Sequence, residues 1–144
     1  MATVQSILTQ KGRQVVSTMV GDSVLDAATL MNQRGIGGLI VLDGDQVVGM
    51  FTERDILRRV VAAQRDPART PVGEVMTTPV AVCRGETSLE ECRAVMTAKR
   101  IRHLPVMDED RVCGIITIGD LMAREVTEHE ATIQYLNEYI FGVR

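Results

Sequence analysis

The chain has 144 residues, which is long enough for one compact domain or for two small, tightly packed halves. Its formal net charge is -3, and no long block of Lys and Arg is present, which argues against nonspecific binding to a nucleic-acid backbone. No apolar run approaches the roughly 20 residues of a membrane-spanning helix, and the first residues lack the basic and apolar stretches of a signal peptide. We therefore expect a cytoplasmic protein whose partners are neither nucleic acid nor membrane.

The three cysteines, Cys83, Cys92 and Cys113, lie among apolar neighbours. Their odd number and their spacing fit neither a Cys-x-x-Cys motif nor a zinc site. We therefore expect reduced, buried thiols and no bound metal.

An internal repeat dominates the sequence. A shift of 65 positions aligns residues 23–59 with residues 88–124 without a gap, and 12 of the 37 aligned pairs are identical. Average composition would give only about 2 or 3 identities by chance. The chain is therefore a tandem duplication, and each copy is expected to fold in the same way.

In the first copy, a short strand is predicted at 15–18 and is followed by a helix that Asp22 caps. A hairpin with strands at 39–42 and 47–51 comes next, and a short helix from 53 to about 64 completes the copy. The first helix is amphipathic, with its apolar face formed by Val24, Ala27, Ala28 and Met31.

The second copy repeats this order. A strand is predicted at 80–83, and Thr87 with the glutamate three residues on forms a capping box for the next helix. The hairpin strands are expected at 103–107 and 112–116, and the last helix at 118 to about 126. The apolar face of the capped helix consists of Leu89, Cys92, Val95 and Met96.

The flanking segments complete the predicted organisation. A helical turn is expected at 4–8, ending near Gly12, and residues 65–71 read as a linker because they contain two prolines. The predicted limits are 4–65 for the first repeat, 72–127 for the second and 128–141 for a C-terminal helix. That helix has an apolar stripe, which either closes the core or forms a dimer interface: Ile133, Leu136 and Ile140.

Each copy is about 60 residues, which is marginal for independent folding. Two sheets packed against each other would complete one core and leave clefts at the pseudo-twofold interface between the copies. The fold class is therefore expected to be α/β (α+β).

Each copy closes with the same pattern of glycine, two apolar residues, threonine, two variable residues and aspartate. The carboxylates of Asp55 and Asp120 could accept hydrogen bonds from both hydroxyls of a ribose. The hydroxyls of Thr52 and Thr117, with the free N–H groups of a helix start, suit a phosphate. The same pattern has a structural interpretation, because threonine and an acid three residues later form a helix cap. The glycine that precedes each motif favours the ligand site.

Two copies of strand, helix, strand, strand and helix, each closed by Gly-h-h-Thr-x-x-Asp with h apolar, resemble the CBS-domain family, named after cystathionine β-synthase. Residues 52–56, 75–77 and 102–106 add further matching motifs, and the resemblance covers roughly 4–126. It implies tandem β-α-β-β-α repeats packed as a pseudo-twofold pair. It also implies adenosine-containing ligands such as AMP, ATP or NAD(H) in two interfacial clefts, with aspartate on the ribose and threonine on the phosphate.

The two clefts are expected to be unequal. The resemblance places a basic side chain at His103 that faces the ligand phosphates, whereas the first copy has Gly38 at the matching position. Arg102 could equally make this contact, since neighbouring residues of a strand face opposite sides. A surface or capping role for His103 also stays open.

Four further residues are candidates for ligand contact. Pro105 cannot donate to a strand ladder, so it indicates an edge or a strand start and leaves a carbonyl or an apolar wall for an adenine ring. Ile40 occupies the matching place in the first copy, which weakens the case for adenine there. The resemblance puts Thr18 near the base, although a plain strand-end role is equally open. Arg54 is either a second phosphate contact or a solvated helix residue.

We consider three functions for a chain with these features. A module that senses adenine nucleotides and regulates an unidentified partner, through a homodimer, agrees best with the motifs. An enzyme is not expected, because the histidines have no cysteine, serine or acid placed for a nucleophile system. A scaffold protein, in which both motifs only cap helices, is the remaining alternative.

Overall fold

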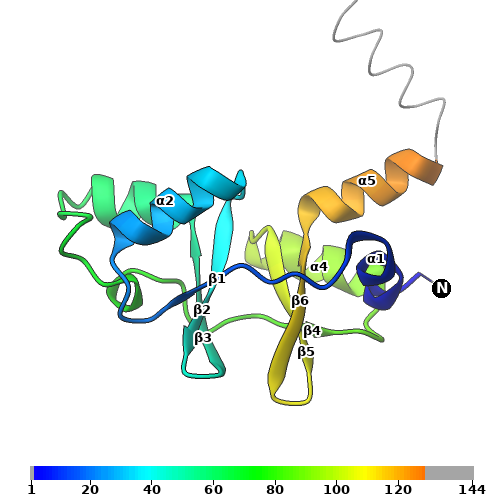
Figure 1. Ribbon diagram of the computed structural model, residues 1–144. Helices are drawn as coiled ribbons and strands as arrows, with labels where there is room; N and C mark the ends of the chain where they lie inside the picture. The colour runs from blue at the N-terminus through cyan, green and yellow to red at the C-terminus, as the bar shows by residue number, and fades with distance from the viewer. Residues whose placement is uncertain (1, 129–144) are drawn as a thin grey trace, which may run out of the picture.

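The computed structural model describes residues 2–128, and each copy of the repeat forms a three-stranded sheet (Figure 1). The first sheet contains β1 (Ser17–Met19), β2 (Gly38–Asp43) and β3 (Gln46–Thr52), and the second contains β4 (Cys83–Arg84), β5 (His103–Asp108) and β6 (Arg111–Thr117). In both sheets the middle strand is parallel to the first and antiparallel to the last. The mixed α/β architecture of a tandem pair is thus confirmed.

The helices also repeat between the copies. They are α1 (Val4–Lys11), α2 (Val24–Arg34), α3 (Glu53–Asp55), α4 (Leu89–Lys99) and α5 (Ile118–Glu128), with a π-helix at Ile56–Val61 and a 3₁₀ turn at Val72–Glu74. The expected helix after each Thr-x-x-Asp motif is therefore present, although in the first copy it continues as a π-helix. The predicted C-terminal helix at 128–141, with its apolar stripe, lies outside the described residues.

Two helix caps differ from the prediction by one residue. Ser23 and Ser88 cap α2 and α4, and their hydroxyls accept hydrogen bonds from N–H groups three residues on, at 3.0 and 3.1 Å. Asp22 and Thr87 instead close the preceding turn by accepting from the N–H groups of Met19 and Arg84. The predicted caps at Asp22 and Thr87 are wrong because these side chains satisfy the strand end rather than the helix start.

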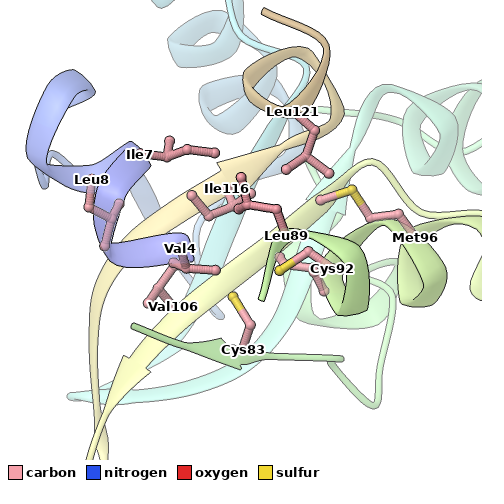
Figure 2. Close-up of a cluster of buried hydrophobic side chains, with 11 residues drawn as sticks. Val4, Ile7, Leu8, Cys83, Leu89, Cys92, Met96, Val106, Ile116 and Leu121 are labelled. Carbon is pink, nitrogen blue, oxygen red and sulfur yellow. The ribbon is translucent and has the colours of Figure 1, made fainter. Parts of the chain in front are cut away.

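The segment that precedes each copy of the repeat packs into the hydrophobic core of the other copy. Val4, Ile7 and Leu8 of α1 pack into the core of the second copy (Figure 2), and Figure 1 shows α1 close to α4 and far from α2. Reciprocally, Val72 and Val75 complete the core of the first copy. The predicted repeat limits mark the duplication in sequence, whereas the packing units cross between them. This exchange joins the two copies into one structure.

All three cysteines are free thiols, and Figure 2 shows the sulfurs of Cys83 and Cys92 pointing toward one another. Cys83 and Cys92 are buried, and Cys113 is partly exposed. The hydrogen bond between the first two thiols, together with burial, raises the pKa of Cys83, and the same bond lowers the pKa of Cys92. The pair fills the space between β4 and α4 as part of the apolar core.

Candidate functional site

The two Thr-x-x-Asp motifs both form capping boxes. The N–H of Thr117 donates to Asp120 Oδ2 at 2.9 Å, and the N–H of Asp120 donates to Thr117 Oγ1 at 3.1 Å. Thr52 and Asp55 exchange the same two bonds at 3.0 and 3.4 Å. Each motif is therefore a structural cap in this protein. A cap of this kind uses one carboxylate oxygen, so a ligand role depends on the other oxygen.

The second carboxylate oxygen of the first motif is occupied. Thr77 donates its hydroxyl proton to Asp55 Oδ1 at 2.8 Å, and the guanidinium Nε of Arg59 lies 3.8 Å from the same oxygen. Asp55 is only 4% exposed. A ribose could reach this carboxylate only by displacing Thr77, so the first motif offers no free carboxylate oxygen.

The second motif is more open. Asp120 forms an ion pair with Lys11, whose Nζ lies 2.8 Å from Oδ2. The side chain of Lys11 is 31% exposed and that of Asp120 is 21% exposed. Lys11 also donates to the backbone carbonyl of Ile115 at 3.0 Å. Among the described residues, Oδ1 of Asp120 has no hydrogen-bond partner. Oδ1 of Asp120 is therefore available, and Oδ2 is held by the backbone N–H of Thr117 and by the long side chain of Lys11.

The difference between the motifs follows from residues 11 and 12 and their counterparts 76 and 77, which precede the aligned ranges 23–59 and 88–124. Thr77 corresponds to Gly12 at the spacing of 65, and Met76 corresponds to Lys11. Gly12 has no side chain to place on Asp120, and its φ of 92° is favourable only for glycine. The sequence reasoning did not identify Lys11. Extending the alignment from residue 23 back to residues 11 and 12 would have shown this substitution.

His103 lies where the two copies meet. A Cβ atom added to Gly38 would come within 3.2 Å of the imidazole, so the glycine leaves room for the His103 ring. Burial lowers the pKa of His103, while the carboxylate of Glu53 opposes this shift. The positive charges of Arg102 and Lys11 lower the pKa further. The sequence predicted His103 and Gly38 as matching positions of two different clefts. The structure brings them into one interface.

Pro105 lies within the middle strand of its sheet, not at an edge or a strand start as expected. It pairs with Ile115 on β6, and on its other side β4 begins too late to face it. In the first copy, the N–H of Ile40 donates to the carbonyl of Val16 at 3.4 Å. Proline has no N–H, so the matching carbonyl, that of Ala81, cannot receive this bond. The proline therefore shortens β4 and leaves an acceptor beside the sheet.

The remaining candidates are placed less favourably. Thr18 is 5% exposed, and its hydroxyl donates to Asp22 Oδ2 at 3.0 Å, within its own turn. Arg54 is exposed, and its Nη1 donates to the carbonyl of Arg100 at 3.2 Å, so it connects the two copies. Arg102 is exposed at the start of the second hairpin. These contacts give Thr18 and Arg54 structural roles in addition to the predicted ones.

The glycines of the two motifs have a packing explanation. A Cβ atom on Gly114 would lie 2.8 Å from the Cδ2 atom of Leu8, and one on Gly49 would collide with the sulfur of Met76. Both neighbours belong to the exchanged N-terminal segments. The glycines therefore allow these segments to cover the sheets and do not by themselves favour a ligand, contrary to the sequence interpretation.

Two hollows in the described part of the chain are lined by residues other than Asp120. One of about 380 Å³ is lined by residues 14–17 with Leu30 and Arg34, and one of about 400 Å³ lies along α4. Within residues 2–128, no group of three or more His, Cys, Asp or Glu side chains is arranged to hold a metal ion. None of the described helices combines the length and apolar character needed to cross a bilayer.

Comparison with known proteins identifies the family. The CBS domain profile matches residues 6–62 and 72–126. The chain belongs to the CBS-domain family. CBS pairs are modules associated with adenosine-containing ligands and with regulation. The reading of the sequence as a tandem CBS pair is thus confirmed.

Two relatives illustrate the similarity of this CBS pair to known proteins. The CBS domain-containing protein CBSX3, mitochondrial, of Arabidopsis thaliana is 34% identical over 149 residues, which cover 97% of this chain and 72% of the relative. A solved structure of a CBS-domain protein from Burkholderia ambifaria has a TM-score of 0.86 and 42% identity, and the match covers 89% of this chain and 96% of that one.

A second solved structure is hypoxic response protein I, which contains two coordinated zinc ions. Its TM-score is 0.74 at 31% identity, and the match covers 85% of this chain and 98% of that one. A curated relative named hypoxic response protein 1 is from Mycobacterium tuberculosis. The zinc ions are a property of that structure.

Proposed function

We propose that this CBS pair is a regulatory module that binds one adenine nucleotide, such as AMP, ATP or NAD(H), in the cleft beside Thr117 and Asp120. The observation that carries this proposal is the unpaired Oδ1 of Asp120 on a carboxylate that is 21% exposed. A carboxylate oxygen at a cleft edge can accept the hydroxyl hydrogen bonds of a ribose. Catalysis forms no part of the proposal.

Neighbouring groups support a phosphate in the same cleft. His103 faces Thr117 across the β5–β6 ladder, and Arg102 and Lys11 place positive charge near the imidazole. An anion would reduce the repulsion among these groups. The carbonyl of Ala81, which Pro105 cannot satisfy, supplies an acceptor for the amino group of an adenine.

We further propose that binding stabilises one arrangement of the two copies and that a homodimer transmits this change to a regulated partner. Arg54 and His103 each contact the other copy of the repeat. A ligand that contacts His103 would therefore favour the arrangement in which these contacts are made. The size of any such change is limited by the difference in ligand affinity between the two arrangements.

A scaffold role without a nucleotide is the second candidate. It is favoured by the capping boxes, which account for both motifs, and by the occupation of Asp55 by Thr77. Under this interpretation the motifs stabilise helices and the protein acts only through its surface.

Thermal unfolding with ligands distinguishes these candidates. Millimolar AMP, ATP or NADH should raise the melting temperature of the wild-type protein, because a ligand of the folded state stabilises it. Asp120→Asn should lose most of this shift, since a hydrogen bond to a charged group contributes about 1.5–3 kcal/mol. Asp55→Asn should unfold at a lower temperature without ligand but retain the ligand-induced shift.

The matched control is Asp110→Asn, which makes the same charge change in the exposed β5–β6 turn. It should behave like wild type with and without ligand. If no adenine nucleotide shifts the wild-type transition, the sensor proposal fails and the scaffold candidate gains support. Equal losses of the shift in the Asp55 and Asp120 variants would contradict the assignment of the cleft.

A further inference from the structure

Lys11 connects the N-terminal helix to the candidate site. Its Nζ lies 2.8 Å from Asp120 Oδ2 and 3.0 Å from the carbonyl oxygen of Ile115. The lysine is the last residue of α1, the helix exchanged into the second core, and Gly12 follows it in a glycine-favoured conformation. The cation at the cleft is therefore anchored by the packing of α1, while its long side chain can still change direction.

We propose that Lys11 makes this cleft selective for nucleotides that carry phosphate and disfavours uncharged nucleosides. The inference rests on the proposed function and adds to it the residue that sets the preference for a phosphate-bearing ligand. Lys11 holds the carboxylate that a ribose requires, so the ligand must provide a replacement for Asp120 as the partner of the ammonium group.

The first step of the argument is competition at Asp120. One oxygen already accepts bonds from Lys11 and from the backbone N–H of Thr117. A ribose with two hydroxyl donors would use the free Oδ1 and compete with Lys11 for Oδ2. The ammonium group would then retain only the neutral carbonyl of Ile115. Loss of this partner removes a charge-assisted hydrogen bond from Lys11, whose side chain is 31% exposed.

The second step is compensation by the ligand. The charged groups that influence His103 are Glu53 and Asp120, which are negative, and Arg102 and Lys11, which are positive. If a ribose engages Asp120, the two cations are left with less negative charge nearby. A phosphate provides this charge, and a charge-assisted bond from Lys11 to phosphate replaces the bond to the carboxylate. An uncharged nucleoside cannot provide it.

The first copy serves as an internal comparison. Met76 stands where the second copy has Lys11, and the cation beside Asp55 is Arg59, which lies on the same helical segment. Arg59 donates to the carbonyl of Met76 at 2.8 Å, in the segment that covers the first motif. Its counterpart Arg124 donates to Ser6 Oγ at 3.0 Å. Within residues 2–128, the second aspartate therefore takes its cation from a distant segment of the chain, whereas the first takes it from its own helical segment.

Binding of AMP and adenosine to Lys11→Met tests the inference. By titration calorimetry, wild type should bind AMP more tightly than adenosine. In Lys11→Met the ratio of the two affinities should fall about tenfold, which corresponds to one charge-assisted bond. AMP should bind more weakly, whereas adenosine should bind as well as before or better, because Asp120 no longer has a competing partner.

Lys99→Met is the matched control, since Lys99 is exposed in the last turn of α4. It should keep the wild-type ratio, and Lys11→Arg should keep a preference for AMP. An unchanged ratio in Lys11→Met, or equal losses for AMP and adenosine, would overturn the role of Lys11 while leaving the nucleotide site intact. Absence of binding by either ligand to wild type would overturn both the site and this inference.

Discussion

At the residue scale, position 103 shows how the two copies of the duplication came to differ. The second copy has His103 where the first has Gly38, and the imidazole occupies the space that the glycine leaves open. Burial lowers the pKa of this histidine below its ordinary value of 6.5, so the folded protein favours the neutral ring. The unfolded chain binds a proton at that position more readily than the folded one.

This linkage predicts that acidification destabilises the protein. Between about pH 7.5 and about pH 5.5, the unfolded state takes up more protons at His103, so the free energy of unfolding should fall as the pH falls. His103→Gln should lose less stability over this range in urea titrations at each pH. Glu53→Gln should lose more, because Glu53 raises the pKa of His103. Identical pH slopes in wild type and His103→Gln would contradict the prediction.

At the element scale, α1 is the part of the chain whose role is least apparent from its position. It precedes the first copy but contributes Val4, Ile7 and Leu8 to the core of the second (Figure 2). The backbone N–H of Val4 donates to the carbonyl of Thr87, which fixes α1 next to the start of α4. The same helix carries Lys11 to Asp120. The stability of the second copy and the positive charge beside Asp120 therefore depend on one element.

The packing of α1 predicts a large effect of Leu8→Ala. Leu8 is 1% exposed, and removal of a buried leucine side chain costs about 2–5 kcal/mol. Urea denaturation should show this loss, and hydrogen exchange should show reduced protection of β5 and β6. Gln10→Ala, on the exposed side of the same helix, should stay close to wild type. A similar small change in both variants would indicate that α1 does not contribute to the second core.

At the scale of the whole molecule, the two exchanged segments have different effects on the two motifs. The segment from Val75 to Thr77 covers the first motif and places a hydroxyl on Asp55. The end of α1 covers the second motif but places an ammonium group on Asp120 and no side chain from Gly12. Pseudo-twofold packing is thus retained, while one carboxylate is closed and the other is open.

This asymmetry predicts one bound nucleotide per chain. Calorimetric titration of wild type with AMP or ATP should give a stoichiometry near one, because binding at Asp55 would require loss of the Thr77 hydrogen bond inside a buried site. Asp120→Asn should abolish most of the heat signal. Two equivalent sites per chain would contradict the closed state of the first motif.

Much of the fold could be predicted from the duplication. The hairpin strands lie within one residue of their predicted ends, and α2 and α4 begin one residue later than the predicted caps imply. The strands β1 and β4 are shorter and begin later than predicted, because their limits depend on pairing with the middle strand. The helix caps are Ser23 and Ser88 and not the predicted Asp22 and Thr87. Each pair of neighbouring polar side chains divides the N–H groups, since the first accepts from the strand end and the second from the helix start.

The candidate site was predicted in part. The sequence identified Asp120, Thr117 and His103 as one group and the first copy as the weaker one, on the basis of Gly38 and Ile40. It missed Lys11 and Thr77, which are the residues that distinguish the two carboxylates. Both lie in segments that meet their partners only through tertiary packing, more than 20 residues from the aspartates they contact.

The sequence by itself determined the repeat, the order of elements and the family, because local patterns and their spacing are properties of the chain alone. Only the tertiary structure decided which segment covers which motif. Lys11 is 109 positions from Asp120, and no periodicity relates the two residues. The exchange of α1 brings them together, because burial of Val4, Ile7 and Leu8 in the second core fixes where the helix ends. The charge beside Asp120 thus follows from the hydrophobic packing of the same helix.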